Sequence, residues 1–411
     1  MRRLGAPAVS EFLPLAGVRV VDVTSSLAGP TCTQLLASLG ADVVKVEPLT
    51  GDPQRGLQNL LNFETSGVNP FVEIPNRGKR SIGIDLANDA GHDVLLKLVE
   101  SADVFLTSYL SSSRTKLRID VDDLRAVNPR LIYARGTGWG SRGPLADQGG
   151  FDSASAWATG GTAYRLTDPG AAQPVMQPAA FYDLQGSAAV AGGISAALFH
   201  RERTGEPTVV DVSLLGVSMW TLAPDIVSAP YVPDVPRFNR RRPPNPLVNW
   251  YLTADGRWLH FVLLQADRFW PEFCDVIGHP ELIDDERFSD AKRRFENREE
   301  CVRTLDEIFA SAPLAEWRRR LETFSGVWAV VLTPREVHDH EQVEPNGYLP
   351  LVTTAEGAEF RLVAPPMQFD GVAGVPRAAA PHAGEHTEEL LLEVGLDWDA
   401  IISYKERGGI L

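Results

Sequence analysis

One aspartate stands where this chain is richest in chemical possibilities. Asp183 lies at the start of the segment FYDLQGSAAVAGGISAALFHRERTG, which runs from Phe181 to Gly205. Cations near the end of this segment and its closing glycine predict a helix that stops at Gly205. An aspartate at a helix entrance most often caps the helix by accepting a backbone N–H, although a carboxylate can also act as a nucleophile. The residues alone leave both roles open.

The same helix is unusually rich in glycine. Gly186, Gly192 and Gly193 lie inside it, and each destabilises a helix by about 1 kcal/mol relative to alanine. We therefore expect another backbone or a ligand to lie very close to this helix.

A compact group of cations precedes a second segment of interest. Arg77, Lys79 and Arg80 come just before the alternating stretch at residues 81–86, which predicts a strand. Such a group is either the solvated end of a strand or a phosphate-binding patch. Three more cations follow along the chain: Arg114, Lys116 and Arg118.

Other motifs in the sequence give weaker evidence for a functional site. The run His338-Asp339-His340-Glu341 contains possible metal ligands, but histidines at i and i+2 do not share a helix face, so a surface loop is favoured. Tyr109 and Trp139 lie next to base-rich and glycine-rich turns, where packing and ligand contact are both open. The sequence has no G-x-S-x-G elbow, no H-E-x-x-H helix and no Walker loop.

These residues need a scaffold, and the first half of the chain predicts one. Residues 18–24 and 41–47 read as buried parallel strands around a helix that begins near Pro30. The turn between them, TSSLAGP, lacks the G-x-G-x-x-G of a dinucleotide site. Further strands are expected at residues 102–106, 131–135 and 208–213, with helices between them. This alternation predicts an α/β domain with a parallel sheet, and a glycine-rich loop at residues 136–144 follows one of its strands.

The second half changes in character. Residues 223–247 are rich in proline and predict a linker, and the hairpin signal that follows predicts a second, smaller α+β domain. We expect the large domain to comprise residues 1–222 and 340–411, with the linker and small domain at residues 223–339. A loose lead-in is expected over residues 1–14.

The composition limits the kinds of binding partner and the cellular location that can be expected for this protein. The 411 residues have a formal net charge of -15 and a pI of about 5.0, which disfavours nucleic acids and anionic membranes as partners. Three widely spaced cysteines form neither a disulfide framework nor a zinc pattern. With no apolar run long enough to span a bilayer, the expected location is the cytoplasm.

Taken in order, several segments resemble the class III CoA-transferase family, which includes formyl-CoA and carnitine CoA-transferases. The matching segments extend from residue 15 to residue 395: LAGVRVVDVTSSLAGPTCTQLLASLGADVVKVEP, GDPQRG, NRGKRSIGIDL, ESADVFLTSY, VNPRLIYARGTGWGSRGP, DLQGSAAVAGGISAALFHRERTG, TADGRWLHF, DERFSDAKRRFENREE and AGEHTEELLLEVG.

The resemblance implies a fold and a mechanism. Two chains would interlock as linked rings, each with a Rossmann-like large domain and a small domain. The family's nucleophile falls on Asp183. It would attack an acyl-CoA thioester and pass CoA to a carboxylic acid acceptor through an aspartyl-CoA thioester, with no metal or prosthetic group. Backbone amides near Ala28, Gly29 and Gly186 are the expected oxyanion donors.

The resemblance also implies a set of CoA contacts. By position they are Ser26, Leu27, Ala28, Lys79, Ser108, Tyr109, Lys116, Thr137 and Trp139. Leu27 replaces a glutamine of the formyl-CoA transferases, which argues against a formyl and oxalate pair and hints at a larger or less polar acyl group. Lys116 replaces an arginine, which binds phosphate differently.

Two alternatives remain. The α-methylacyl-CoA racemases share the fold but use a histidine in a G-H-D stretch as an acid–base partner. Here that stretch is Gly150-Phe151-Asp152, and Phe151 cannot take a proton, so transfer is favoured over racemisation. The other alternative is a CoA-binding paralogue without turnover, against which the retained Asp183 argues.

Overall fold

The structure is a computed structural model. It describes residues 13–65, 67–232, 237–374 and 378–411. The expected lead-in therefore lies, as far as residue 12, outside the described residues, and so do small parts of the expected linker and of the return segment.

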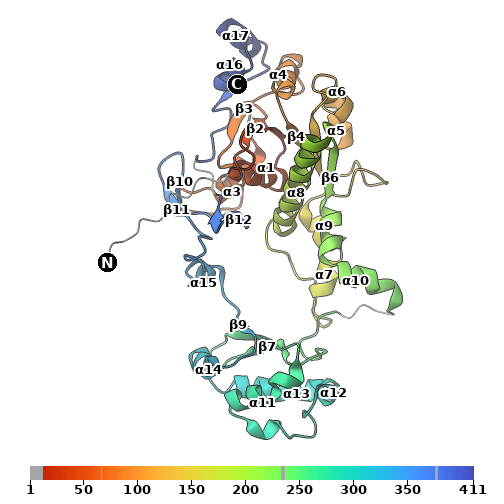
Figure 1. The fold of residues 1–411 in the computed structure, drawn as a ribbon, viewed down its shortest axis with the longest axis vertical. Coiled ribbons are helices and arrows are strands. Elements are labelled where there is room, and N and C mark those ends of the chain that lie inside the picture. The colour runs from red at the N-terminus through yellow and green to blue at the C-terminus, as the bar shows by residue number, and fades with distance from the viewer. Residues whose placement is uncertain (1–12, 66, 233–236, 375–377) are drawn as a thin grey trace. The chain divides into compact units, whose positions relative to one another are not determined.

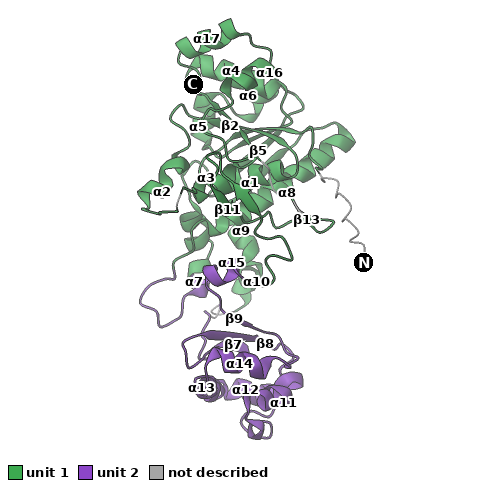
Figure 2. Cartoon of the chain, turned by 90° about the vertical axis from the view of Figure 1, so that its left-hand side faces the viewer, with its two compact units in different colours: residues 1–163, 176–233, 341–411 green, residues 164–175, 234–340 purple. Residues whose placement is uncertain are grey.

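The chain divides into two compact units, which Figure 2 shows in different colours. Unit 2 comprises residues 164–175 and 234–340. Unit 1 comprises the three remaining stretches: 1–163, 176–233 and 341–411.

Unit 1 is built on a six-stranded sheet in which every neighbouring pair is parallel. Its spatial order is β3-β2-β1-β4-β5-β6. The strands are β1 (Arg19–Val23), β2 (Asp42–Glu47), β3 (Arg80–Gly83), β4 (Val104–Thr107), β5 (Ile132–Thr137) and β6 (Val209–Ser213). The direction of chain growth reverses between β1 and β4, and at such a point the loops leaving the carboxyl ends of the strands diverge and leave a crevice.

Helices cover both faces of this sheet (Figure 1). Neighbouring residues of a strand point to opposite faces, so Val20 packs under one helical layer and Val21 under the other. The first layer consists of α1 (Ala28–Ser38) and α8 (Phe181–Thr204). The second contains α4 (Asp89–Glu100), α6 (Val121–Arg125), α16 (Thr387–Glu393) and α17 (Trp398–Glu406). The end of the chain thus returns to the large sheet.

Shorter elements fill the connections of unit 1. They are η1 (Pro53–Gly56), α2 (Leu57–Leu60), α3 (Pro70–Asn76), α5 (Ser111–Leu117), the π-helix η2 (Asp152–Ala158), α9 (Leu214–Thr221), α10 (Ala223–Ser228) and η3 (Ala229–Tyr231). Helix α7 (Thr162–Leu166) begins in unit 1 and ends in unit 2. Two small hairpins follow: β10 (Leu351–Thr353) with β11 (Glu359–Arg361), and β12 (Gln368–Phe369) with β13 (Val372–Ala373). The segment expected to be a linker from residue 223 therefore begins as helix, a correction to the sequence reading.

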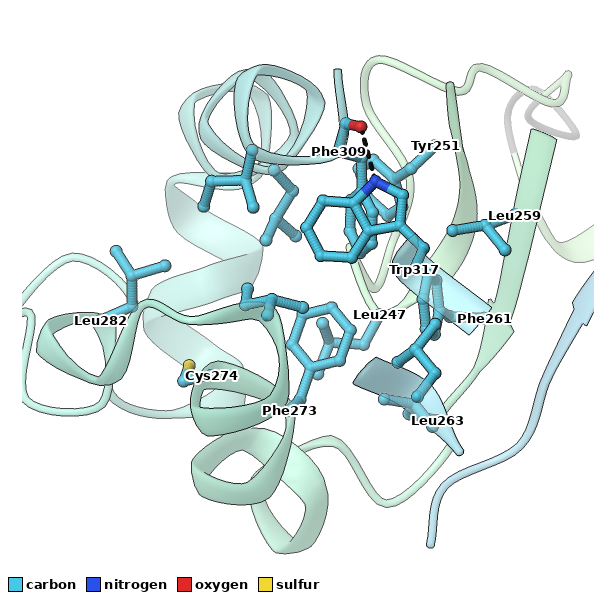
Figure 3. Packing of buried hydrophobic residues seen from close by; sticks show 14 of the residues in the cluster. Leu247, Tyr251, Leu259, Phe261, Leu263, Phe273, Cys274, Leu282, Phe309 and Trp317 are labelled. Carbon is cyan, nitrogen blue, oxygen red and sulfur yellow. Dashed lines mark hydrogen bonds between the residues drawn. The ribbon is translucent and has the colours of Figure 1, made fainter. Parts of the chain in front are cut away.

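Unit 2 has its own aromatic core (Figure 3). Trp317 lies at its centre, and the indole N–H donates to the carbonyls of Phe309 at 2.9 Å and Ala312 at 3.0 Å. A three-stranded antiparallel sheet and five main helical segments surround it: β7 (Val248–Leu252), β8 (Trp258–Val262), β9 (Trp328–Val330), α11 (Ala266–Ile277), η4 (Pro280–Leu282), α12 (Ala291–Glu296), α13 (Arg298–Phe309) and α14 (Leu314–Leu321).

The suspected metal motif is part of an exposed surface. His338 ends the short helix α15 (Pro334–His338) and pairs with Asp339. Among the residues that the structure describes, no three histidine, cysteine, aspartate or glutamate side chains are grouped to hold a metal ion. In the same described part of the chain, no helix is long and apolar enough to cross a membrane.

Candidate active site

A cavity of about 230 Å³ opens at the carboxyl ends of β1, β4, β5 and β6. This is the edge of the sheet at which its order reverses, where α/β proteins commonly bind ligands. The loops that follow these strands contribute Ser25, Ser26, Ala28, Gly29, Ser108, Leu110, Gly136, Thr137, Gly138, Gly149, Gly150 and Phe151. The remaining walls are Asp183, Gly186 and Val190 of α8, with Val212 and Leu214.

The cavity brings together residues that lie far apart in the sequence. Asp183 shares it with Ser26, Ala28, Ser108 and Thr137, all of which the sequence analysis selected. The remaining selected residues, Leu27, Lys79, Tyr109, Lys116 and Trp139, are not part of its lining. Their places in the structure differ and are described below.

Asp183 does not cap its helix, which corrects the most common reading of an aspartate at this place. Helix α8 begins at Phe181, and its N-cap is Ala180 with a left-handed φ of 59°. Asp183 is therefore a first-turn residue, and no described residue donates a hydrogen bond to its carboxylate. The pKa of Asp183 is raised from 3.8 to about 7, mainly by burial and to a smaller extent by the charge of Asp152.

Asp152 is a residue whose role sequence analysis missed. It begins the π-helix η2 and is 7% exposed. Its Oδ2 has no hydrogen-bond partner within the described chain. A buried carboxylate this close disfavours a second negative charge, so it acts on Asp183 by repulsion.

The loop of residues 24–30, which leads from β1 into α1, is held in place by a network of buried charged side chains. Asp22, in β1, accepts hydrogen bonds from the backbone N–H of Thr24 at 3.2 Å and its hydroxyl at 2.5 Å. It also accepts from Thr33 at 2.6 Å and from the ammonium of Lys79 at 2.9 Å. Lys79 in turn donates to the carbonyl of Pro30 at 2.8 Å. Both ends of the loop from residue 24 to residue 30 are therefore tied to one carboxylate.

A second lysine completes the network. Lys45 donates to the carbonyl of Thr24 at 3.2 Å and to Asp52 at 2.8 Å. The side chains of Lys45, Lys79 and Asp22 have no exposed surface. Although burial alone would raise it, these two lysines hold the pKa of Asp22 below its ordinary value. The signal for this network was present in the sequence, where Asp22 and Lys45 interrupt the apolar residues of the strands VRVVDVT and ADVVKVE.

The three cations are paired within the fold, which argues against a phosphate patch and against the CoA contact expected of Lys79. The ammonium of Lys79 forms a buried ion pair with Asp22. Arg77 pairs with Glu73 at 2.7 Å, and Arg80 pairs with Asp42 at 2.8 Å. Each cation is committed to a carboxylate of the same chain, so none of the three is left to bind an external anion.

Helix α8 approaches its neighbours closely at two of its three glycines. A Cβ on Gly193 would lie 2.7 Å from Cγ1 of Val210, and one on Gly186 would lie 3.2 Å from Cδ2 of Leu214. A Cβ on Gly192 would meet nothing within 4 Å. The expected close approach therefore comes from β6 and α9, and Gly186 also faces the cavity.

The first turn of α1 supplies the free amides of the site. Ala28 and Gly29 are the first residues of this helix, whose leading amides have no intrahelical acceptor. Gly186 is the sixth residue of α8, so its amide is used within the helix, and the expectation that it donates to an oxyanion is wrong. Ser187 joins the two helices, because its hydroxyl lies 2.8 Å from the carbonyl of Ala28 and 2.7 Å from that of Asp183.

Trp139 shapes the glycine-rich wall from behind. Its indole N–H donates to the carbonyl of Gly149 at 3.1 Å, which closes the loop on itself. A Cβ on Gly138 would lie 2.8 Å from Cα of Gly150, so the two backbones touch where they line the cavity. The indole therefore contacts the loop and does not line the cavity, and the CoA contact that the resemblance implies for Trp139 stays a prediction.

A second pocket, of about 330 Å³, opens at the ends of β2 and β3. Tyr109 and Leu117 form one side of it, next to the exposed Lys116 at the end of α5. Tyr109 directly follows Ser108, which lines the first cavity, so both pockets are lined by residues from the end of β4. Leu27 lines neither of the two pockets and is the N-cap of α1.

Comparisons with known proteins agree on one family. A model described as CoA-transferase family III matches residues 15–387. The (R)-2-hydroxy-4-methylpentanoate CoA-transferase of Clostridioides difficile is 30% identical over 95% of this chain and 98% of its own. The succinate–glutarate CoA-transferase of Agrobacterium fabrum is 30% identical over 93% and 96%. A crystal structure of the Mycobacterium tuberculosis protein Rv3272, 29% identical, superposes with a TM-score of 0.79 and covers 93% of this chain and 100% of that one.

We predict that Lys79→Met lowers the free energy of unfolding by about 3–5 kcal/mol, because it leaves the Asp22 carboxylate buried without its partner. Urea denaturation measures this change. The double variant Asp22→Asn, Lys79→Met should lose less, since no unpaired charge remains. Lys116→Met, an exposed lysine, is the matched control. A loss no larger than that of the control would contradict the buried network.

We predict that Asp183→Asn stabilises the protein more at pH 8 than at pH 5. The folded state holds the Asp183 proton up to about pH 7 and the unfolded state only to about 3.8, so ionisation costs the wild type stability as the pH rises between these values. Asparagine avoids that cost. Melting temperatures at the two pH values measure the difference, and the exposed Asp399→Asn serves as control. An equal effect at both values would refute the raised pKa.

Proposed function

The chain belongs to CoA-transferase family III and is an enzyme of that class, and from this premise we propose that it transfers CoA through an aspartyl-CoA thioester on Asp183. The observation behind the proposal is the position of Asp183: its carboxylate lines the cavity at the reversal point of the sheet without a hydrogen-bond donor. A partly buried carboxylate without a hydrogen-bond donor is a stronger nucleophile than a fully hydrated one.

The proposed reaction has four displacements at carbonyl carbons. Asp183 attacks the donor thioester and forms a mixed anhydride, and CoA leaves as a thiolate. The thiolate attacks the aspartyl carbon, which gives aspartyl-CoA and releases the donor acid. The acceptor carboxylate then attacks aspartyl-CoA, and the thiolate finally takes the acceptor acyl group and regenerates the Asp183 carboxylate. Bonds and charges balance without a metal, a redox group or a prosthetic group.

Each step places negative charge on a carbonyl oxygen. The first-turn amides of α1, at Ala28 and Gly29, are the donors proposed to receive it, since both residues line the cavity. The Asp22 network holds these amides in place by fixing both ends of their loop. Ser187 fixes their separation from Asp183.

The CoA molecule is proposed to extend from the cavity at Asp183 to the second pocket. Its thiol end would reach Asp183 past Ser26, Ser108 and Thr137, and its nucleotide would occupy the second pocket beside Tyr109. Lys116 is the exposed cation beside that pocket, and no ion pair occupies it within the described chain. It therefore replaces Lys79 as the proposed phosphate contact.

We propose that two copies of the chain form the interlocked homodimer. Large apolar side chains are exposed on α9, α10 and η3, where Trp220 is 83%, Val227 68% and Tyr231 84% exposed. A patch of this kind marks a protein–protein contact. The cytoplasmic location remains a proposal, supported by three buried, free cysteines.

The proposed intermediate predicts a covalent adduct. Incubation with a panel of acyl-CoAs should add an acyl group or CoA to the wild type and nothing to Asp183→Ala, as measured by intact mass. In deuterated water, the recovered acyl-CoA should carry no α-deuterium. An α-deuterated product without an adduct would instead identify a racemase. Absence of both, with CoA still bound, would identify a binding protein without turnover.

The proposed dimer predicts a mass of twice 44.9 kDa in sedimentation experiments. Because linked rings cannot separate while folded, dilution should not reduce this mass, whereas urea should reduce it together with the loss of helix. Trp220→Asp should lower the yield of the folded dimer, and Trp398→Asp, on the exposed helix α17, should not. A mass of one chain would refute the dimer.

A further inference from the structure

Family membership leaves the acyl group open, because the relatives named above act on branched hydroxy acids in one case and on dicarboxylic acids in another. The side chains that line the cavity around Asp183 limit the kinds of acyl group that can bind there. Five of its side chains are apolar and come from four different segments: Leu110, Phe151, Val190, Val212 and Leu214. The rest of the lining is mostly glycine, alanine and hydroxyl side chains, which are neutral.

The charge of this wall is equally informative. Among the described residues that line the cavity, Asp183 is the only one with a charged side chain. The lysines beneath the loop are buried and paired with Asp22 and Asp52. Nothing in the lining can therefore neutralise a second carboxylate on a bound acyl group.

A dicarboxylic acyl group would bring such a carboxylate into the cavity. It would lie among apolar side chains and near Asp183, whose pKa is already raised by burial and by the charge of Asp152. Burial of an unpaired anion is strongly unfavourable, and like charges nearby increase the penalty. An apolar acyl group of the same shape has the opposite effect, because each methylene that it buries is favourable.

The mouth of the cavity supports the same conclusion. Phe151 is 73% exposed although its neighbour Asp152 is 7% exposed, so the ring stands at the rim of the cavity and not in the core. An aromatic ring in this place can cover a bound hydrocarbon chain and exclude water from it. The cavity volume of about 230 Å³ suits a short acyl group.

We propose that the enzyme acts on short, apolar monocarboxylic acyl groups and discriminates against dicarboxylic ones. Leu110, Phe151, Val190, Val212 and Leu214 determine this specificity. Leu27, the residue in which the sequence hinted at a less polar acyl group, is not among them. The inference rests on the proposed function, since it takes Asp183 as the residue that meets the acyl carbon.

The test measures exchange between an acyl-CoA and its own isotopically labelled free acid, which removes any need to know the natural acceptor. Succinyl-CoA and 4-methylpentanoyl-CoA form a matched pair, because a terminal carboxylate and a terminal isopropyl group have similar shapes. Mass spectrometry of the labelled thioester gives kcat/KM for each. We expect 4-methylpentanoyl-CoA to be favoured by about 100-fold, and each methylene from propanoyl- to pentanoyl-CoA to add about fourfold.

A cation introduced into the wall should reverse the preference. Leu110→Arg should raise exchange of succinyl-CoA at least about tenfold and lower that of 4-methylpentanoyl-CoA, because it pairs the terminal carboxylate. Leu60→Arg, in an exposed position outside the cavity, is the matched control and should change neither rate.

The outcomes separate the two levels of the proposal. Exchange of succinyl-CoA as fast as that of its apolar partner would overturn the specificity and leave CoA transfer intact. A Leu110→Arg variant that folds, as judged by its melting curve, and keeps the wild-type preference would also overturn it. Exchange with neither thioester, or exchange that persists in Asp183→Asn, would overturn the proposed function itself.

Discussion

The architecture of the site depends on one buried carboxylate. Asp22 lies in the middle of a parallel sheet without exposed surface, where a lone anion would be strongly destabilising. It is tolerated because two threonine hydroxyls, a backbone amide and the ammonium of Lys79 surround it. The same partners hold the loop that turns from β1 into α1. A polar cluster of this kind permits few alternative arrangements, and its rigidity passes directly to the wall that faces Asp183.

Charged side chains thus have opposite environments in two neighbouring parts of the large unit: they are paired beneath the loop and unpaired in the cavity. Beneath the loop, every buried charge is compensated, and the result is a fixed backbone. In the cavity, Asp183 is left without a donor and near a second carboxylate, and the result is a reactive group with a raised pKa. A carboxylate held in this way lowers stability, which is a recurrent cost of catalytic sites. The helix that follows the stabilising network and the helix that carries Asp183 are joined through Ser187, whose hydroxyl contacts both.

Small residues make this junction possible. Gly193 and Gly186 let α8 approach β6 and α9, and Gly138 and Gly150 let two stretches of one loop touch. Larger residues would move Asp183 away from the amides of α1. The apolar side chains then complete the cavity, so that its lining combines free backbone amides with apolar side chains.

The amino-acid sequence determined the α/β class of the large unit and most of its strands, because buried parallel strands and helix signals are local patterns. The family followed from the order of several matching segments, and that resemblance selected Asp183, Ser26, Ala28, Ser108 and Thr137, which share one cavity. It could not tell a ligand-binding cation from a buried one: Lys79 follows an apparently solvated cluster, and only the fold places it against Asp22. Nor could it find Asp152 or the apolar wall, since those residues come from segments far apart in the chain. Burial and the partners of a charge are properties of the assembled structure, and they decided which residues position, which react and which select.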